Sequence, residues 1–366
     1  MKKNITVALM LVGISLIGFL AILHKEVNTV PEDTEHFIDL YFTNTNGTLA
    51  TYIKDTQEED EDIVKGREAL SESLGFWMEY ALEKEDAALF KQAYSTLNHY
   101  FLDEQETGFV YWKITENGEK HVQTNALIDD MRIVHALFQA ADKWEERSYQ
   151  QTAERISKQV ISSNRNEELL TDFYDQRTNA SSQIITLSYI EPNVLNLLDE
   201  KEFVSSSLRT NMFDVLENMP RENAFFPKSY DVKKKKYSFD QSVNLIDQTL
   251  VAISLERMNE STQAYYNFIT NELNREKAVY GSYDLESKSP VVSHESPALY
   301  GLLITYAIER GEHDLAKQFH EKMTSLQHQN TRYNGGYTVQ QNNSHIFDNL
   351  VPLLAKQKMK KNHLFE

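Results

Sequence analysis

The chain has 366 residues, of which 41% are hydrophobic and 11% aromatic. This length and composition exclude disorder over most of the chain and allow a large core. The formal charge of −18 argues against a nucleic-acid partner, because a phosphate-binding surface needs a basic stripe. Cysteine is absent, which excludes disulfides, thiolate nucleophiles and Cys-rich zinc sites.

The N-terminus predicts a membrane segment. Residues 1–4 contain two lysines and are expected to stay in the cytoplasm, and residues 5–23 form an apolar run long enough to cross a bilayer as a helix. No small-residue cleavage pattern follows the run, so an uncleaved anchor is favoured over a removed signal peptide. With either alternative, the chain from about residue 30 onward is expected outside the cell, with the membrane as a partner.

Residues 24–60 are expected to form a linker and the start of the folded domain, and residues 61–366 its main body. Apolar residues recur there at three- and four-residue spacing, which predicts about eleven or twelve helices arranged in pairs. The clearest predicted helices cover residues 71–82, 85–102, 126–144, 148–163, 202–217, 243–258, 262–273, 297–309 and 313–326.

Short aromatic, strand-like pieces separate the helix pairs and recur with a regular step. They begin at residues 108, 170, 225, 280 and 335, so the last three steps are 55 residues each and the first is 62. Such a repeat of helix, turn, helix and short strand predicts an all-α fold, a six-hairpin α/α barrel with strand-like insertions. An open helical solenoid is the alternative, although solenoid repeats are usually shorter.

The same repeat aligns polar residues at the start of the first helix of each pair. Because these starts are expected at one end of the barrel, the side chains would converge on a cleft; repeated helix caps are the alternative. Phase places Asp130 and Asp247 near the buried stripes of their helices, where an acid is costly without partners or a solvated cleft. The aligned residues are Glu72, Asp130, Tyr189, Asp247, Glu295 and Asp348.

Glu72 opens a largely apolar helix beside an aromatic cluster. Ser71 is expected to cap the helix, and Phe76 and Trp77 follow Glu72 by about one turn. This pattern is typical of a general acid next to a sugar-stacking wall, with Trp77 as a possible platform or as core. The alternative is that Glu72 only complements the helix dipole.

Four ordered motifs resemble those of glycoside hydrolase family 8, and the similarity covers roughly residues 60–350. They are Ser-Glu-Ser-Leu-Gly-Phe-Trp-Met around Glu72, Tyr-Trp-Lys-Ile around Trp112, Asp-Asp-Met-Arg-Ile-Val-His-Ala-Leu around Asp130, and Ser-Tyr-Ile-Glu-Pro around Tyr189. The chain is most similar to the membrane-anchored branch of Gram-positive bacteria that is associated with exopolysaccharide degradation.

The resemblance implies a six-hairpin α/α barrel and an endo-acting, inverting hydrolase of β-linked polysaccharide. It implies that Glu72 is the general acid, that Trp112 stacks on a sugar ring, and that Tyr189 lies by the cleavage point. The motif Asp-x-Asp is altered, with Ile128 in place of its first Asp and Asp129 and Asp130 remaining.

The catalytic base is less clearly indicated, because the segment that carries it in many members is not intact. Asp247 follows Tyr189 at the expected distance and is favoured, whereas Asp231 matches local letters but comes early. Asp240 and Asp130 are further alternatives. Glu295, in His-Glu-Ser-Pro, is another acidic candidate and resembles related α/α-barrel hydrolases outside the family.

No zinc motif, nucleophile elbow or phosphate loop is present, and we expect no metal or cofactor. Asp129, Arg132, Trp77, Trp112, Tyr189 and Glu295 are the predicted substrate-binding residues, with Arg132 expected to pair with an acid near the cleft. The sequence thus predicts a membrane-tethered, extracellular hydrolase of a biofilm-type exopolysaccharide, with export or synthesis machinery as a possible partner. A non-catalytic polysaccharide-binding barrel and a helical protein-interaction scaffold are the alternatives.

Overall fold

The computed structural model describes residues 33–54, 64–221, 224–329 and 331–364. Residues 33–366 form one compact unit. The predicted membrane segment, residues 5–23, and the predicted cytoplasmic residues 1–4 lie outside the described residues. Among the residues described, no helix has the length and apolar character needed to cross a membrane.

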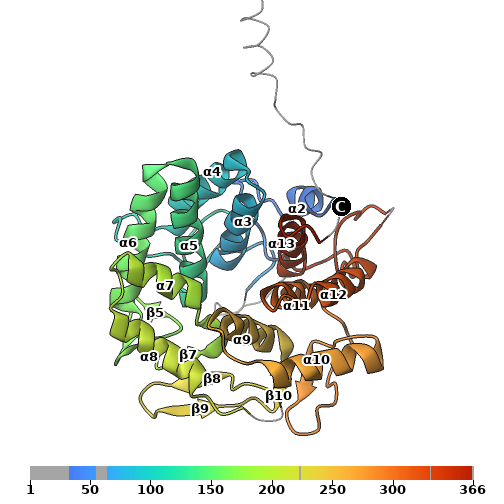
Figure 1. The fold of residues 1–366 in the computed structure, drawn as a ribbon. Coiled ribbons are helices and arrows are strands. Elements are labelled where there is room, and N and C mark those ends of the chain that lie inside the picture. The colour runs from blue at the N-terminus through green and yellow to red at the C-terminus, as the bar shows by residue number, and fades with distance from the viewer. Residues whose placement is uncertain (1–32, 55–63, 222–223, 330, 365–366) are drawn as a thin grey trace, which may run out of the picture. The chain divides into compact units, whose positions relative to one another are not determined.

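Six helices of this unit follow one another around a closed ring. Each inner helix packs against the next, and the last packs against the first. Figure 1 shows this progression of colour from the blue α3 through the green α5 to the dark red α13. The inner helices are α3 (Ser71–Glu83), α5 (Leu127–Trp144), α7 (Pro192–Glu200), α9 (Leu245–Arg257), α11 (Pro297–Glu309) and α13 (Phe347–Lys361).

A second set of helices covers the ring from outside, each packed on an inner helix. The outer helices carry apolar residues on one face, as the predicted helix pairs required. Helix α2 packs on α13, so an element from the beginning of the unit completes the hairpin at its end. The outer helices are α2 (Asp33–Tyr41), α4 (Ala87–Thr96) with its π-helical extension η1 (Leu97–Phe101), α6 (Arg147–Ser163), α8 (Ser206–Glu217), α10 (Gln263–Glu276) and α12 (His313–Ser325).

Short antiparallel strands connect the hairpins near the N-terminal ends of the inner helices. Strand β1 leads directly into α3, β10 leads into α9, and β7 leads into the 3-10 turn η2 (Leu187–Tyr189) before α7. The pairs are β1 (Ala69–Leu70) with β2 (Lys113–Ile114), β3 (Arg165–Asn166) with β4 (Leu169–Leu170), β5 (Tyr174–Asp175) with β6 (Ala180–Ser181), β10 (Ser242–Asn244) with β11 (Ser282–Asp284), and a three-stranded sheet in the order β7 (Ile184–Thr186), β8 (Ser229–Asp231), β9 (Lys236–Ser238).

Aromatic side chains fill much of the space between inner and outer helices. Tyr265, Tyr283, Tyr300 and Tyr306 are among the largest fully buried side chains. Buried tyrosine hydroxyls need hydrogen-bond partners, and Thr249 meets Tyr265 at 2.7 Å between α9 and α10. Most of the aromatic residues therefore serve helix packing rather than ligand binding.

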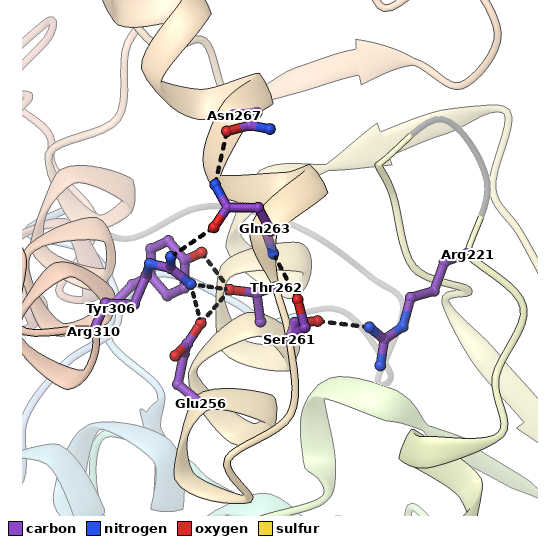
Figure 2. Close-up of polar contacts among 8 residues, drawn as sticks. All are labelled: Arg221, Glu256, Ser261, Thr262, Gln263, Asn267, Tyr306 and Arg310. Carbon is purple, nitrogen blue, oxygen red and sulfur yellow. Dashed lines mark hydrogen bonds and ion pairs between the residues drawn. The ribbon is translucent and has the colours of Figure 1, made fainter.

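A polar network joins the turn between α9 and α10 to the end of α11 (Figure 2). The hydroxyls of Thr262 and Tyr306 lie 2.6 Å apart, and the Arg310 guanidinium donates to Thr262 at 2.8 Å. Glu256 accepts from both Thr262 and Arg310, so hydrogen bonds hold the ends of three helices together.

The predicted helices agree with the structure to within a few residues, and the closed ring replaces the open solenoid alternative. Three helices absent from the clearest predictions are α2, α7 and α13. Helix α2, within the predicted region of linker and domain start, packs on α13. Helix α2 has only nine residues, so its apolar spacing is a weak signal in the sequence. Its position in the fold follows from its packing on the partner helix at the other end of the chain.

Candidate active site

Glu72 lies in the first turn of α3, at the end of the ring where all six inner helices begin. The prediction that Ser71 caps this helix is wrong: the N-cap residue is Leu70, and its side chain makes no cap hydrogen bond. The Ser71 hydroxyl instead donates to Asp129 Oδ2 at 2.8 Å. Burial raises the pKa of Glu72 to about 7, the negative charge of Asp129 adds to the rise, and Arg132 opposes it.

Asp129 begins α5 and is the carboxyl that faces the start of α3. It accepts from Ser71 and from the Arg132 guanidinium, whose Nη1 lies 3.2 Å from its Oδ1. Burial raises the pKa of Asp129, while Arg132 and Ser71 favour its charged form. The carboxyl groups of Glu72 and Asp129 therefore both interact with the single guanidinium of Arg132. This arrangement favours protonation of one of the two carboxyl groups.

Asp130, the next residue, lies in a different environment. It is 1% exposed, and its Oδ2 accepts from Asn125 Nδ2 at 2.6 Å, while Asn125 also bonds Asn164 at 2.9 Å. Its Oδ1 is buried and has no hydrogen-bond partner among the described residues. Burial raises its pKa well above the usual range. This environment suits a neutral carboxyl that ties α5 to the strand-like segments rather than one that contacts substrate.

Tyr189 lies at the end of η2, surrounded by carboxyl groups. Burial raises the pKa of its hydroxyl, and the negative charges of Asp129, Asp172, Glu72 and Asp247 raise it further. Carboxyl groups from four segments of the chain therefore raise the pKa of this one phenol. The phenol consequently remains protonated and available as a hydrogen-bond donor at neutral pH.

Asp247, in the first turn of α9, has two fixed partners. Its Oδ1 accepts from the Ser188 hydroxyl at 3.1 Å, and its Oδ2 is bonded to the ammonium group of Lys228. The two contacts fix the orientation of the Asp247 carboxylate. Lys228 precedes β8, so the hairpin of β8 and β9 supplies the countercharge for a carboxylate on the ring.

Two site residues had not been singled out from the sequence, Asp172 and Lys228. Asp172 accepts from the backbone N–H and the hydroxyl of Thr186 at 2.6 and 2.8 Å, and burial raises its pKa. The signal available for Asp172 was its place within one of the recurring aromatic pieces. Lys228 lies close in sequence to several other lysines, and only its ion pair with Asp247 distinguishes it from them.

The two predicted sugar platforms have different surroundings. Trp77 is buried in the hydrophobic core and stacks on Tyr80 with ring centroids 5.5 Å apart, which favours the alternative that it is a core residue. Trp112 is partly exposed, and its carbonyl accepts the backbone N–H of Ser71 at 2.9 Å. The backbone of Trp112 therefore lies beside the start of α3, and its indole contacts the Lys113 ammonium group, whose Nζ is 5.4 Å from the ring centroid.

The remaining acids of the predicted set border a groove of about 780 Å³ at the same end of the ring. Glu295 precedes α11 and accepts from the Tyr300 hydroxyl at 2.6 Å, and Asp348 in α13 accepts from Ser296 and Thr338 at 3.2 and 3.0 Å. Tyr52, Asn244, His294 and His345 also line this groove. The described lining residues include no lysine or arginine.

The alternative bases lie in other settings. Asp231 accepts the backbone N–H groups of Lys233 and Lys234 in the turn between β8 and β9, which fixes it as a turn residue. Asp240 is exposed before β10. The four lysines from Lys233 to Lys236 are exposed in this turn and at the start of β9.

Comparison with known proteins decides the family. Residues 21–278 match the model of the glycosyl hydrolases family 8. This chain belongs to that family. It is a glycoside hydrolase with the helical barrel fold that the motifs around Glu72 and Asp130 predicted, rather than a helical interaction scaffold or a non-catalytic binding barrel.

Three relatives show how far the likeness extends. The putative lipoprotein YdaJ of Bacillus subtilis is 36% identical over 338 residues, covering 91% of this chain and 89% of its own length. A novel alpha-amylase from Clostridium perfringens has the same fold at 23% identity and a TM-score of 0.80, covering 89% of this chain and 96% of that one. PssZ from Listeria monocytogenes is 24% identical with a TM-score of 0.74, covering 90% and 96%.

Proposed function

We propose that this family 8 hydrolase is an endo-acting, inverting enzyme that cleaves a secreted exopolysaccharide at the N-terminal end of its helical ring. The observation that carries the proposal is the pKa of Glu72, raised to about 7 at a position next to Asp129. Near neutral pH, a carboxyl group with this pKa is protonated in a substantial fraction of the protein molecules, as a general acid must be.

In the proposed reaction, Glu72 donates its proton to the glycosidic oxygen as the bond to the leaving sugar breaks. Asp129 favours this role because its negative charge disfavours the loss of the proton from Glu72 before substrate binds. Tyr189, held protonated by its acidic surroundings, would donate a hydrogen bond to the sugar at the cleavage point. These roles accord with an oxocarbenium-like transition state, in which the leaving oxygen needs a proton.

Asp247 is the proposed base, which accepts a proton from the attacking water. Its ion pair with Lys228 and its hydrogen bond from Ser188 hold the carboxylate in a fixed orientation, as a base that activates water requires. In an inverting enzyme the two carboxyl groups are about 6.5 to 9.5 Å apart, so that one water fits between the base and the sugar. Asp172, also near Tyr189, is the alternative base that the site offers.

The groove beside the site is proposed to hold further sugar units of the polymer. Amide and hydroxyl side chains such as Asn244, Ser282 and Asn343 line it and are typical partners for sugar hydroxyls. A cleft that continues beyond the catalytic groups suits internal cleavage of a chain. Trp112 is proposed as a stacking surface on the other side of Glu72.

We further propose that the enzyme acts outside the cytoplasm while attached to the membrane. The relative YdaJ is named a putative lipoprotein, which is consistent with a membrane-associated place. This chain has no cysteine, so a cysteine-linked lipid is excluded and the apolar residues 5–23 would supply the attachment. An association with exopolysaccharide synthesis or export machinery would follow from that location.

The test is reducing-end release from a panel of bacterial exopolysaccharides, carboxymethylcellulose and soluble starch, with wild type and Glu72→Gln compared. Starch belongs in the panel because one structural relative is named an alpha-amylase. Release by the wild type alone, with inversion at the new anomeric carbon by NMR, is expected. Equal release by Glu72→Gln would refute the assigned acid, and retention of configuration would refute the inverting mechanism.

A further inference from the structure

Arg132 occupies an unusual place between the first two inner helices. It lies in the second turn of α5, with only 12% of its side chain exposed. Its guanidinium carbon is 3.9 Å from the centroid of the Phe76 ring on α3, and its Nη1 is 3.2 Å from Asp129 Oδ1. The guanidinium is thus held by an aromatic face and a carboxylate, which together fix the direction of its charge.

A glycine on the facing helix makes room for this side chain. A Cβ atom added at Gly75 would lie 3.2 Å from Cδ and 3.4 Å from Cγ of Arg132, and 3.5 Å from Ile133. Gly75 lies inside α3, where glycine costs about 1 kcal/mol relative to alanine in helix propensity. The aliphatic part of Arg132 therefore passes through a notch that the absence of a side chain at position 75 creates.

Behind the guanidinium lies a separate cavity of about 370 Å³ along the axis of the ring. We call it the axial pocket. Glu79 of α3 pairs there with Lys358 of α13 at 2.9 Å, and although burial disfavours its charge, Lys358, Arg132 and His135 lower the pKa of Glu79 to about 2. The charged and titratable residues that line the axial pocket are Glu79, Glu83, Arg132, His135, Glu191, Arg257, Glu309, Lys358 and Lys361.

Arg132 lines this axial pocket and also contacts the carboxyl group of Asp129 at the N-terminal end of the ring. At the N-terminal end of the ring, the positive charge of Arg132 acts to lower the pKa of both Asp129 and Glu72. On the pocket side, Arg257 has its own partners, Glu191 and Glu309, each at 2.9 Å. Removal of Arg132 would leave Asp129 with the Ser71 hydroxyl as its remaining hydrogen-bond donor among the described residues.

We propose that Arg132 is a positioning residue for catalysis: seated in the Gly75 notch, it fixes Asp129 beside Glu72 and thereby sets the pH range over which the acid works. This inference rests on the proposed function of Glu72. It replaces the sequence-based expectation that Arg132 binds substrate, since its guanidinium is directed to Asp129 and Phe76.

The test compares Arg132→Met, Arg132→Lys and Gly75→Ala with wild type in the full chain. Loss of the positive charge favours the protonated form of Glu72, so the alkaline limb of kcat/KM for Arg132→Met should move upward by about half to one pH unit. Its kcat should fall about tenfold to a hundredfold because Asp129 loses its fixed geometry. Arg132→Lys should restore the position of the limb in part, and Gly75→Ala should lower kcat while keeping the charge.

Arg257→Met is the matched control, because it removes a similarly buried, ion-paired arginine from the far side of the axial pocket. It should lose stability without shifting the limb. If Arg132→Met moves the limb no more than Arg257→Met does, the inference is overturned and Arg132 is a stabilising ion pair. A rise in KM with an unchanged limb would instead make Arg132 a substrate contact.

A second readout separates this inference from the proposed function. The difference in unfolding free energy between each background and its Glu72→Gln derivative, followed from pH 4 to 9, reports the titration of Glu72 without substrate. If wild type cleaves no polymer, the proposed function fails, yet a higher apparent pKa in the Arg132→Met background still supports the inference. An unchanged pKa there overturns it.

Discussion

The hydroxyl of Ser188 donates a 3.1 Å hydrogen bond to Asp247, which begins the next inner helix of the ring. Ser71 does the same to Asp129 at 2.8 Å, and Ser296 to Asp348 at 3.2 Å. The three serines thus join the six inner helices in pairs, α3 with α5, the η2 and α7 segment with α9, and α11 with α13. The countercharge differs at each pair: Arg132 contacts Asp129 and Lys228 contacts Asp247, whereas Asp348 accepts from Thr338.

Replacement of the proposed acid should abolish turnover without unfolding the protein. We expect Glu72→Gln to lower kcat by about a hundredfold to ten-thousandfold, which is the usual contribution of a general acid. The change is isosteric and leaves the contacts of Asp129 in place. Steady-state cleavage assays and circular dichroism would check it, and activity within tenfold of wild type would contradict the assignment.

The raised pKa of Glu72 also predicts how stability depends on pH. Since its folded pKa of about 7 exceeds the unfolded value near 4.5, the native state holds an extra proton between these limits and its stability falls as pH rises through them. Glu72→Gln removes this cost. We expect it to be more stable than wild type at pH 8 by about 1 to 3 kcal/mol, and equally stable near pH 4, by urea denaturation.

The proposed base and its lysine should give separable effects. Asp247→Asn should remove nearly all activity, while Lys228→Met should retain some turnover. Part of the activity should be lost in Lys228→Met because the ammonium group no longer holds the Asp247 carboxylate in place. Asp231→Asn, at the turn of β8 and β9, is the control and should behave as wild type. Full activity in Asp247→Asn would transfer the role to Asp172.

The neighbours Asp129 and Asp130 should respond in opposite ways. Asp129→Asn should lower kcat, because it removes the charge beside Glu72. Asp130→Asn should fold and turn over substrate nearly normally, since the amide replaces a neutral buried carboxyl. Asp130→Ala should cost about 1 to 3 kcal/mol of unfolding free energy, because Asn125 loses a buried partner. A large loss of activity in folded Asp130→Asn would place Asp130 in the reaction.

The two tryptophans should separate packing from binding. Trp77→Ala should destabilise the fold by about 3 to 5 kcal/mol, as expected for an aromatic residue removed from a core. Trp112→Ala should leave the melting temperature closer to wild type but raise KM for the polymer. Thermal unfolding and kinetics on both variants would check this contrast, and an unchanged KM in Trp112→Ala would remove Trp112 from the proposed cleft.

The helical periodicity, the repeat and the alignment of polar residues at successive helix starts could all be predicted from the sequence. These follow from local physics, because apolar spacing defines the buried face of a helix and a fixed repeat length brings equivalent positions to one end of a ring. The motifs around Glu72 and Tyr189 indicated the family because each motif is a contiguous stretch of the chain.

Which of the aligned groups lie together depends on contacts that form only in the folded chain. Asp129 and Asp130 are adjacent in sequence, yet a rotation of about 100° along α5 directs one toward Ser71 and the other into the Asn125 network. Ser71, expected as a helix cap, donates to Asp129 on the neighbouring inner helix, and the burial of Trp77 favours core over platform. Lys228, Asp172 and the Gly75 notch depend on contacts between distant segments, which local pattern does not encode because side-chain pairing is set by packing.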